Sequence, residues 1–213
     1  DIPTAMVAPV SSPSFAVTFY DGRLVSYDHA GKRRWTQRLM TRPRTVASAI
    51  DGAWTLSGSY NDLGMYGSTG RPHWLNQYAG TSLRQDVTAI GVTPHCEWGV
   101  FGLRDGEIMG LNLLQGAPLF DIDPPGEGGA PRGEPARFGA ITAAKGAWSG
   151  KFIVVSGTKE SAAIAADGNP VWSTKDVRGA LSIDVNFQMT EDDIQSALLG
   201  TRDGTVARFD ETG

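Results

Sequence analysis

Three histidines and a single cysteine are the residues in this chain that could bind a metal ion or act as a nucleophile. The histidines lie far apart in the sequence, at His29, His73 and His95. A zinc site needs ligands at short, convergent spacings, and these residues do not have them. Cys96 follows His95 directly, but neighbours in sequence do not make the hydrogen-bonded pair that activates a thiol. We therefore expect no metal site, no catalytic residue of this kind and no cofactor.

Acidic residues offer a second chemistry, the hydrolysis of glycosidic bonds. That reaction uses two carboxyl groups held about 5 to 9.5 Å apart. Asp86, Glu97 and Asp184 are the candidates, because each lies beside a short apolar run of the kind that forms a β-strand. Nothing in the sequence brings the three together, so glycoside hydrolysis is the third of three alternative functions.

A dense basic cluster could bind an acidic partner. Its charges alternate with Trp35 and Leu39, as on the outer strand of a sheet, where charge prevents unwanted strand pairing. The functional interpretation is a docking patch that attracts an acidic protein surface. The sequence leaves both interpretations open. The cluster consists of Lys32, Arg33, Arg34, Arg38, Arg42 and Arg44.

The elements that position these residues recur along the chain, and the first copy runs from Asp21 to Trp35. It begins with Asp21-Gly22, which suits a two-residue hairpin turn because glycine adopts positive φ without steric cost. A β-prone run and a second turn at Gly31 follow, and Trp35 comes four residues after that glycine. We expect the aromatic residues at this place to pack between repeats rather than on a ligand, because large aromatics dominate protein cores. They are Trp35, Trp74, Phe120 and Trp172.

The spacing of the repeats predicts the fold. By subtraction of residue numbers, the second-turn glycines lie 39, 46, 52 and 45 residues apart, at Gly31, Gly70, Gly116, Gly168 and Gly213. A period in the forties with strand–turn–strand content is typical of a four-stranded β-propeller blade. Helical repeats have a similar period, but these segments are too rich in Gly, Thr and Val for amphipathic helices. We expect an all-β protein, a β-propeller of about five four-stranded blades with the last blade incomplete.

The repeat unit is Asp-Gly-x-Leu/Ile followed by Asp or Asn, a second glycine and a tryptophan. It resembles the repeat of quinoprotein-type (PQQ-like) propellers within the wider WD40-like class, and outer-membrane assembly lipoproteins and the large quinoprotein dehydrogenases share it. The resemblance implies the propeller fold, which hosts many functions. The quinoprotein enzymes use an eight-bladed ring, a bound calcium or lanthanide ion and often a vicinal cysteine pair. This chain is about half as long and has one cysteine, so we expect no quinone cofactor.

The repeat predicts a single domain over residues 1–213, with blades at approximately 5–42, 43–84, 85–136, 137–178 and 179–213. A Pro- and Gly-rich stretch at 121–135 joins blades three and four and is predicted to be a surface loop. The expected outer strand of blade five is absent. We therefore expect a propeller excised from a longer chain or completed by another subunit, because an open ring exposes strand edges. A self-closed ring of five blades is the alternative.

Composition narrows the class of function. Hydrophobic content of 40% and charged content of 20% are ordinary for a soluble globular protein. The net charge of −4 argues against a nucleic-acid-binding surface. No apolar run approaches the roughly 18 residues of a membrane-spanning helix. The single cysteine excludes an intrachain disulfide and leaves the compartment open, whether cytoplasmic, periplasmic or extracellular.

The favoured function is a non-catalytic scaffold or sensor module that binds a partner protein through its blade loops or the rim of the disc. The alternative is a lectin-like propeller, which binds a carbohydrate or another small ligand in pockets between blades. A propeller glycosidase is third, because its carboxylates have no predicted convergence.

Overall fold

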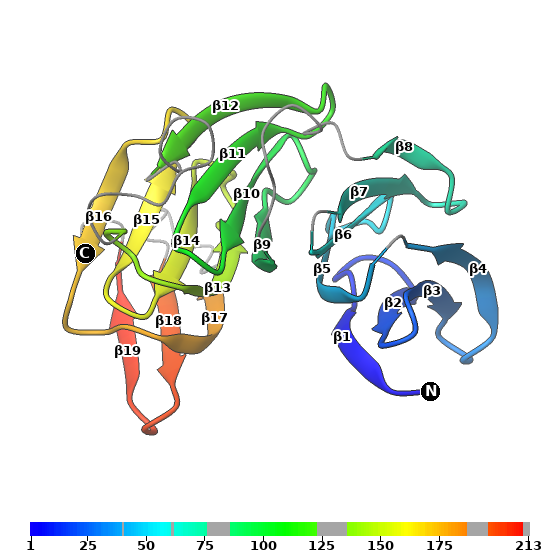
Figure 1. Ribbon diagram of the computed structural model, residues 1–213, viewed down its shortest axis with the longest axis horizontal. Helices are drawn as coiled ribbons and strands as arrows, with labels where there is room; N and C mark the ends of the chain where they lie inside the picture. Colours follow the sequence, from blue (N-terminus) through cyan, green and yellow to red (C-terminus); the bar gives the residue numbers. More distant parts are fainter. Residues whose placement is uncertain (40, 61, 76–85, 123–135, 187–195, 211–213) are drawn as a thin grey trace.

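The structure is a computed structural model that describes the whole chain except residues 40, 61, 76–85, 123–135, 187–195 and 211–213. The described residues form 19 β-strands and no helix. Consecutive strands pair antiparallel in five separate sheets, four with four strands and one with three. Figure 1 shows the sheets following one another in chain order around an arc, as propeller blades do. The prediction of an all-β propeller with about five blades is confirmed. Within the described residues, none forms a helix long and apolar enough to cross a membrane.

Each blade begins with an inner strand and proceeds outward. Blade one contains β1 (Pro3–Val7), β2 (Ser14–Phe19), β3 (Arg23–Asp28) and β4 (Arg33–Arg38). Blade two contains β5 (Pro43–Ser48), β6 (Trp54–Ser59), β7 (Asp62–Gly67) and β8 (Pro72–Leu75). Blade three contains β9 (Val87–Val92), β10 (Trp98–Leu103), β11 (Ile108–Asn112) and β12 (Ala117–Ile122). Blade four contains β13 (Ile141–Gly146), β14 (Phe152–Gly157), β15 (Ser161–Ala165) and β16 (Pro170–Thr174). Blade five contains β17 (Ala180–Asn186), β18 (Ser196–Thr201) and β19 (Val206–Phe209).

The predicted surface loop at 121–135 lies mostly outside the described residues. Its first two residues, Asp121 and Ile122, belong to β12, where they pair with β11 at Met109 and Ile108. Burial raises the pKa of the Asp121 carboxyl above its ordinary value. The described part of this stretch is therefore strand rather than loop.

Two tight turns define the local geometry of the first copy of the repeat, in blade one. Gly22 has a φ of 89° and Gly31 a φ of 77°, in the left-handed region that glycine enters without strain. The N–H of Gly22 donates to the carbonyl of Phe19, and the N–H of Gly31 to that of Asp28. The Asp28 carboxylate also accepts the N–H of Lys32 at 2.8 Å. These residue types therefore reverse the chain at both ends of β3.

The inner strands run in the same direction around the arc. Near their starts, Thr88 Oγ1 in β9 donates to Ile141 O in β13 at 2.6 Å. Near their ends, the Ile50 N–H, which follows β5, donates to Pro94 O, which follows β9, at 2.7 Å. The molecule thus has two faces. We call the face where inner strands begin the start face, and the face where they end the end face.

The hydrophobic core lies between blades rather than within them. The cluster that joins blades two and three includes Leu63, Met65 and Phe101, each fully buried. A second cluster joins blades three and four, with Val100 and Ile153 at its centre, and further clusters join one to two and four to five. Because blades two, three and four each bury their two surfaces against different neighbours, blade-to-blade packing holds the arc together.

The indole N–H groups of two outer-strand tryptophans donate hydrogen bonds to the next blade. Trp35 Nε1 in β4 donates to the Ser68 carbonyl in blade two at 3.0 Å. Trp74 Nε1 in β8 donates to the Leu113 carbonyl in blade three at 2.7 Å. Both acceptors lie in the turn between the third and fourth strands, so each indole ties an outer strand to the following blade.

The two remaining aromatics pack at the same place. Phe120 in β12 lies on the turn of blade four, where a Cβ added to Gly168 would be 2.8 Å from the Phe120 Cγ. Trp172 in β16 stacks on Phe209 in β19, with ring centroids 5.0 Å apart. Its buried Nε1 has no hydrogen-bond acceptor among the described residues. All four aromatics therefore contact the next blade along the chain.

Candidate protein-binding surfaces

A buried carboxylate organises the start face at the boundary of blades two and three. The Asp86 side chain, immediately before β9, is 9% exposed. Arg44 Nη2 lies 3.3 Å and Arg104 Nη1 3.4 Å from Asp86 Oδ2. The arginine side chains are 54% and 68% exposed. One carboxylate thus holds two guanidinium groups whose outer edges face solvent.

The fold places Arg44 at a position that reaches the next blade. Arg44 is the second residue of the inner strand β5. Thr88 and Thr142 are the second residues of β9 and β13, and each donates its Oγ1 to the first residue of the following inner strand. Arg44 makes the longer equivalent contact and crosses to Asp86. The ion pair therefore lies across a blade boundary.

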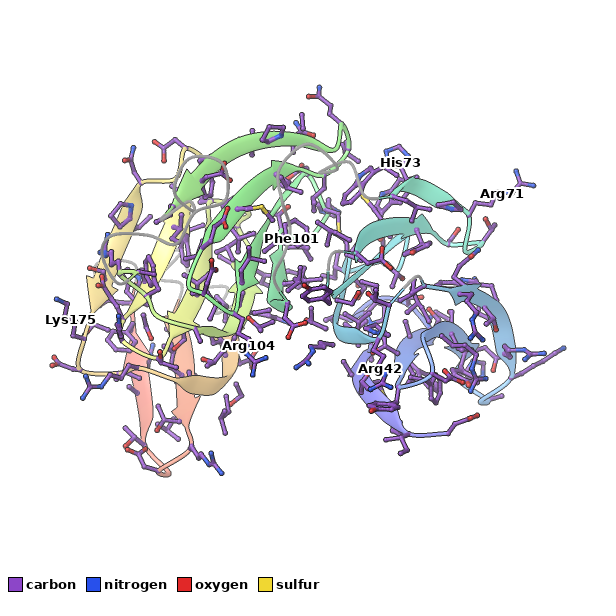
Figure 2. All side chains as sticks on the ribbon, in the orientation of Figure 1. Arg42, Arg71, His73, Phe101, Arg104 and Lys175 are labelled. Atoms are coloured by element: carbon purple, nitrogen blue, oxygen red, sulfur yellow. The ribbon has the colours of Figure 1, made fainter. Side chains whose placement is uncertain are left out.

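A third arginine continues this surface onto blade one. The Arg42 guanidinium lies 3.9 Å from the ring centroid of Tyr20 and donates to its hydroxyl. Tyr20 and Tyr60 are each 48% exposed, and the Tyr60 backbone bridges to Asp86. Figure 2 shows Arg42 and Arg104 near the middle of the view, on neighbouring parts of the arc. We call Tyr20, Arg42, Arg44, Tyr60 and Arg104 the arginine–tyrosine surface.

The residue types on this surface are suited to binding an anion. A guanidinium presents paired N–H donors that match the two oxygens of a carboxylate, and tyrosine supplies apolar area with a polar tip. Asp86 lies beneath two of the three arginines, and further carboxylates are close in sequence to members of the surface: Asp21 beside Tyr20, Asp62 two residues after Tyr60, and Asp105 beside Arg104. The Asp105 carboxylate also accepts the backbone N–H of Glu107 at 3.1 Å. The surface therefore combines three guanidinium groups with carboxylates at its base and edges.

The structure divides the basic cluster that the sequence singled out. Lys32, Arg33 and Arg34 lie at the beginning of β4, towards the end face, and are exposed. Arg38 lies at the opposite end of β4. The last two members, Arg42 and Arg44, belong to the arginine–tyrosine surface. A docking role for the four residues of β4 and the turn before it stays a prediction.

Sequence reasoning missed Arg104 and the pairing of Asp86. Arg104 begins an Arg-Asp-Gly turn that recurs at Arg202, and this pattern indicated a turn rather than a binding group. The sequence did contain a signal for this surface, because the first residue of that turn has a large side chain in several blades. Tyr20 and Tyr60 hold the same place in blades one and two.

The end face carries a cavity of about 510 Å³ where the inner strands of all five blades end. Its lining is mostly apolar, with Lys145, Trp148 and Asp184 as the larger polar contributors. A volume in this range suits a small molecule or a few residues of a peptide. Between blades one and two, a pocket lined by Phe15, Trp35 and Thr55 has a volume of only about 10 Å³, room for one water molecule.

Cys96 lies in the turn that follows β9 and occupies the place of a glycine. It has a φ of 55°, and Gly52 and Gly150 hold the equivalent position in blades two and four, with φ of 72° and 70°. The Cys96 N–H donates to Thr93 O at 2.9 Å, as the two glycines do within their own turns. Burial raises the pKa of the Cys96 thiol to about 12. The side chain fills the core between blades two and three, and it is protonated at neutral pH.

The carboxylates considered for glycoside hydrolysis do not meet. Asp86 and Glu97 flank β9 at its two ends, a separation of about 20 Å at about 3.3 Å per residue. Asp86 is held by two arginines, and Asp184 lines the cavity on the other face. The reaction needs carboxyl groups within about 5 to 9.5 Å of each other. Asp86 therefore does not form a glycosidase pair with Glu97 or Asp184.

The histidines are separated in the same way. His73 packs against the ring of Trp54, with centroids 5.0 Å apart, and its Nε2 lies 2.9 Å from Leu114 O. His29 and His95 are in other blades. Over the described part of the chain, no group of three or more His, Cys, Asp or Glu side chains could hold a metal ion.

Comparisons with known proteins identify the fold. No family model matches the sequence, and no curated protein sequence matches it. Among solved structures, U3-55K has a TM-score of 0.76 and 12% identity, over 100% of this chain and 62% of its own. The RRP9 WD40 repeats have a TM-score of 0.75 and 12% identity, over 100% and 61%. The β-propeller domain of Myceliophteria thermophila Cps50 (Swd1) has a TM-score of 0.73 and 16% identity, over 98% and 66%.

At these identities the likeness shows the fold alone. The chain has the architecture of a WD40-type β-propeller, and it spans less than two thirds of the length of the first two structures. The WD40-like part of the predicted resemblance is confirmed. The finer resemblance to quinoprotein-type propellers stays a prediction.

Proposed function

We propose that this chain is a non-catalytic β-propeller scaffold, and that the arginine–tyrosine surface binds an acidic segment of a partner protein. The observation that carries the proposal is the buried Asp86 carboxylate, which holds Arg44 and Arg104 side by side with their outer edges in solvent. A stability role alone would not require two arginines that are each more than half exposed.

Pre-organisation makes these arginines favourable contacts. A free arginine loses rotamer entropy when it binds, on the order of 0.5 to 1.5 kcal/mol per immobilised side chain. Arg44 and Arg104 are already held by Asp86, and Arg42 is already stacked on Tyr20. Arginine and tyrosine are also the residue types enriched where interfaces derive most of their binding energy.

An acidic segment fits this surface better than a nucleic acid does. The whole chain has a net charge of −4, so a long polyanion would be repelled outside the patch. A short peptide with a few Asp or Glu residues needs only the patch itself. Its carboxylates would pair with the guanidinium edges that Asp86 leaves free.

Small-ligand binding is the second candidate, and the cavity on the end face favours it. At about 510 Å³ the cavity lies within the usual range of ligand sites. Binding of a glycan library to the chain, lost on Trp148→Ala, would support this function. The lectin-like form of the proposal calls for repeated pockets between blades, and the pocket between blades one and two admits only a water molecule.

Fluorescence anisotropy with a labelled deca-glutamate peptide tests the acidic-segment proposal. The Arg104→Ala variant leaves Asp86 paired with Arg44, and we expect it to weaken binding at least threefold. Arg33→Ala removes the same charge from an exposed site on β4 and is the matched control, with a change below about 1.5-fold. Equal losses in the two variants would show a diffuse charge effect and overturn the proposal. So would a single-stranded RNA decamer that binds more tightly than the peptide.

A further inference from the structure

The outer strand of blade one differs from the outer strands of blades two, three and four at one position. Two residues after the second-turn glycine, those three blades have Pro72, Pro118 and Pro170. Blade one has Arg33 there. The position is the first residue of β4, β8 and β16 and the second residue of β12, so it lies at the same place in each blade.

A backbone hydrogen bond at the turn shows which way the main chain of Arg33 points. The Asp28 N–H donates to the Lys32 carbonyl at 2.9 Å. These two residues flank the pair of Tyr27 with Arg33. That pair is therefore a non-hydrogen-bonded pair of the antiparallel β3–β4 ladder. The N–H and the carbonyl of Arg33 consequently point away from β3, towards the outer edge of the blade.

The same bond comes before the proline in two other blades. The Gly67 N–H donates to the Arg71 carbonyl in blade two, at 2.9 Å. The Ala165 N–H donates to the Asn169 carbonyl in blade four, also at 2.9 Å. The proline that follows each acceptor therefore turns its nitrogen to the outer edge, and this nitrogen carries no hydrogen to donate. Proline at such a place protects a sheet edge from pairing with another strand.

The outer edge of β4 has further groups that point outward. The Leu39 N–H donates to the Gly22 carbonyl at 2.8 Å. The pair that these residues flank, Arg23 with Arg38, is therefore also non-hydrogen-bonded. Because the pairs alternate along the strand, Thr36 has the same orientation as Arg38. Among the described residues β4 pairs with β3 alone, and Figure 1 shows β4 at the rim of the arc.

The charge of β4 and of the turn before it selects what can pair there. Asp28, the nearest carboxylate in sequence, accepts the backbone N–H groups of Ala30 and Lys32 at 3.0 and 2.8 Å. A second copy of β4 on this edge would place like charges opposite each other, which destabilises strand pairing. An acidic strand would place opposite charges there. The exposed cations are Lys32, Arg33, Arg34 and Arg38.

We propose that the outer edge of β4 binds an extended acidic segment of a partner protein, which adds to blade one as a fifth strand. Its backbone bonds to the outward groups of Arg33, Thr36 and Arg38, and its Asp or Glu side chains pair with the cations. The main-chain bonds provide affinity, and the charges exclude a second copy of the chain.

This edge is separate from the arginine–tyrosine surface, so the two proposals are independent. A segment of glutamate alone has low strand propensity and is not suited to the β4 edge. The β4 edge calls for acidic residues that alternate with β-branched ones.

A ten-residue peptide of alternating Glu and Val is the probe, and amide-proton exchange with water, measured by NMR, is the readout. We expect a saturating peptide concentration to slow exchange at Thr36 and Arg38 at least tenfold, because their N–H groups become ladder donors. Arg33→Pro gives blade one the proline of the other blades and removes no bond of the β3–β4 ladder. It should raise the peptide concentration for half-maximal slowing at least tenfold. Arg33→Ala keeps the N–H and is the matched control, with a rise below about threefold.

Charge selection is tested without proline. A variant with both Arg34→Glu and Arg38→Glu should prefer a peptide of alternating Lys and Val, with exchange at Thr36 as the readout. The proposal is overturned if the Glu–Val peptide slows neither Thr36 nor Arg38, or if Arg33→Pro leaves the slowing unchanged. Equal slowing of the unaltered chain by the two peptides would also overturn it.

Two further controls separate this proposal from its alternatives. Slow exchange at Thr36 without peptide, increasing with protein concentration and accompanied by dimers in light scattering, would assign the edge to a second copy and overturn the proposal. Binding of deca-glutamate should be the same for Arg33→Pro and the unaltered chain. A loss there would show that Arg33→Pro acts beyond the β4 edge and would overturn the assignment to this edge.

Discussion

Alanine substitutions at equivalent glycines test whether blades interlock as the junctions indicate. Gly102 lies on β10 beneath Ile141 of the next blade, and a Cβ there would be 2.3 Å from Ile141 Cγ2 and 2.6 Å from its Cβ. Carbon atoms pack favourably at about 3.5 to 4.0 Å, so the overlap exceeds 1 Å. Ile141 is 1% exposed and β-branched, which restricts its movement to another rotamer.

The matched control is Gly200→Ala. Among the described residues, the added methyl group would meet only the Ser182 hydroxyl, which is the rotatable end of a side chain, at 2.9 Å. Gly58 is intermediate, with Val87 Cγ1 at 2.7 Å. All three glycines have φ outside the left-handed region, so alanine is allowed by the backbone. The three sites therefore differ in what the next blade places above them.

We expect Gly102→Ala to lower the free energy of unfolding by about 1 to 3 kcal/mol, the usual cost of overpacking. Gly58→Ala should cost less, and Gly200→Ala should be neutral or should stabilise by up to about 1 kcal/mol through the unfolded chain. Urea unfolding followed by tryptophan fluorescence measures all three on one scale. A Gly200→Ala variant as unstable as Gly102→Ala, or a neutral Gly102→Ala variant, would refute the interlocking argument.

Three further predictions follow from a contact at a blade junction, from an end-face turn and from an ion pair within blade four. Trp74→Phe should cost about 1 to 3 kcal/mol more than Trp172→Phe in urea unfolding, because among the described residues the Trp74 indole has a buried acceptor, the Leu113 carbonyl, and the Trp172 indole has none. Cys96 should resist alkylation at pH 8 in the folded chain and react when the chain unfolds. Because folding raises the pKa of the Cys96 thiol to about 12, the free energy of unfolding should fall as the pH rises above about 9. A thiol that reacts in the native state would contradict this prediction. The hydrogen bond from Arg137 lowers the pKa of Glu160, so the stability that this pair adds is present above about pH 4.5 and is lost as the pH falls. Glu160→Gln should therefore reduce the loss of stability in acid. An unchanged profile of stability against pH would exclude this contribution.

Local chemistry explains why the sequence could predict the fold. The turns depend on single residues such as Gly22 and Gly31, whose positive φ is visible as a glycine in the sequence. The aromatic residue that lies four positions after each second-turn glycine likewise marks the outer strand, because it can be recognised from the sequence alone. Both signals act over a few residues and recur, so their period could be read without any knowledge of long-range contacts.

The binding surface depends on contacts that the sequence does not display. Arg44 and Arg104 belong to different blades and meet only because Asp86 lies between them. The basic cluster is continuous in the sequence. In the structure, β4 runs from the end face to the start face, so its length separates Lys32, Arg33 and Arg34 from Arg42 and Arg44. Cys96 was similarly hidden, because only the superposition of three turns shows that it holds the place of Gly52 and Gly150.

The location of the core between blades has a consequence for how this kind of chain can change over evolutionary time. A residue such as Gly102 shares its space with Ile141, which belongs to the next repeat unit, so the two must vary together although they lie 39 residues apart by subtraction. Related sequences should therefore show their strongest pairwise covariation across blade boundaries and not within a blade. Duplication of one internal unit preserves its pairings with the units before and after it and creates one new junction. The mutations that follow a duplication should concentrate at that new junction.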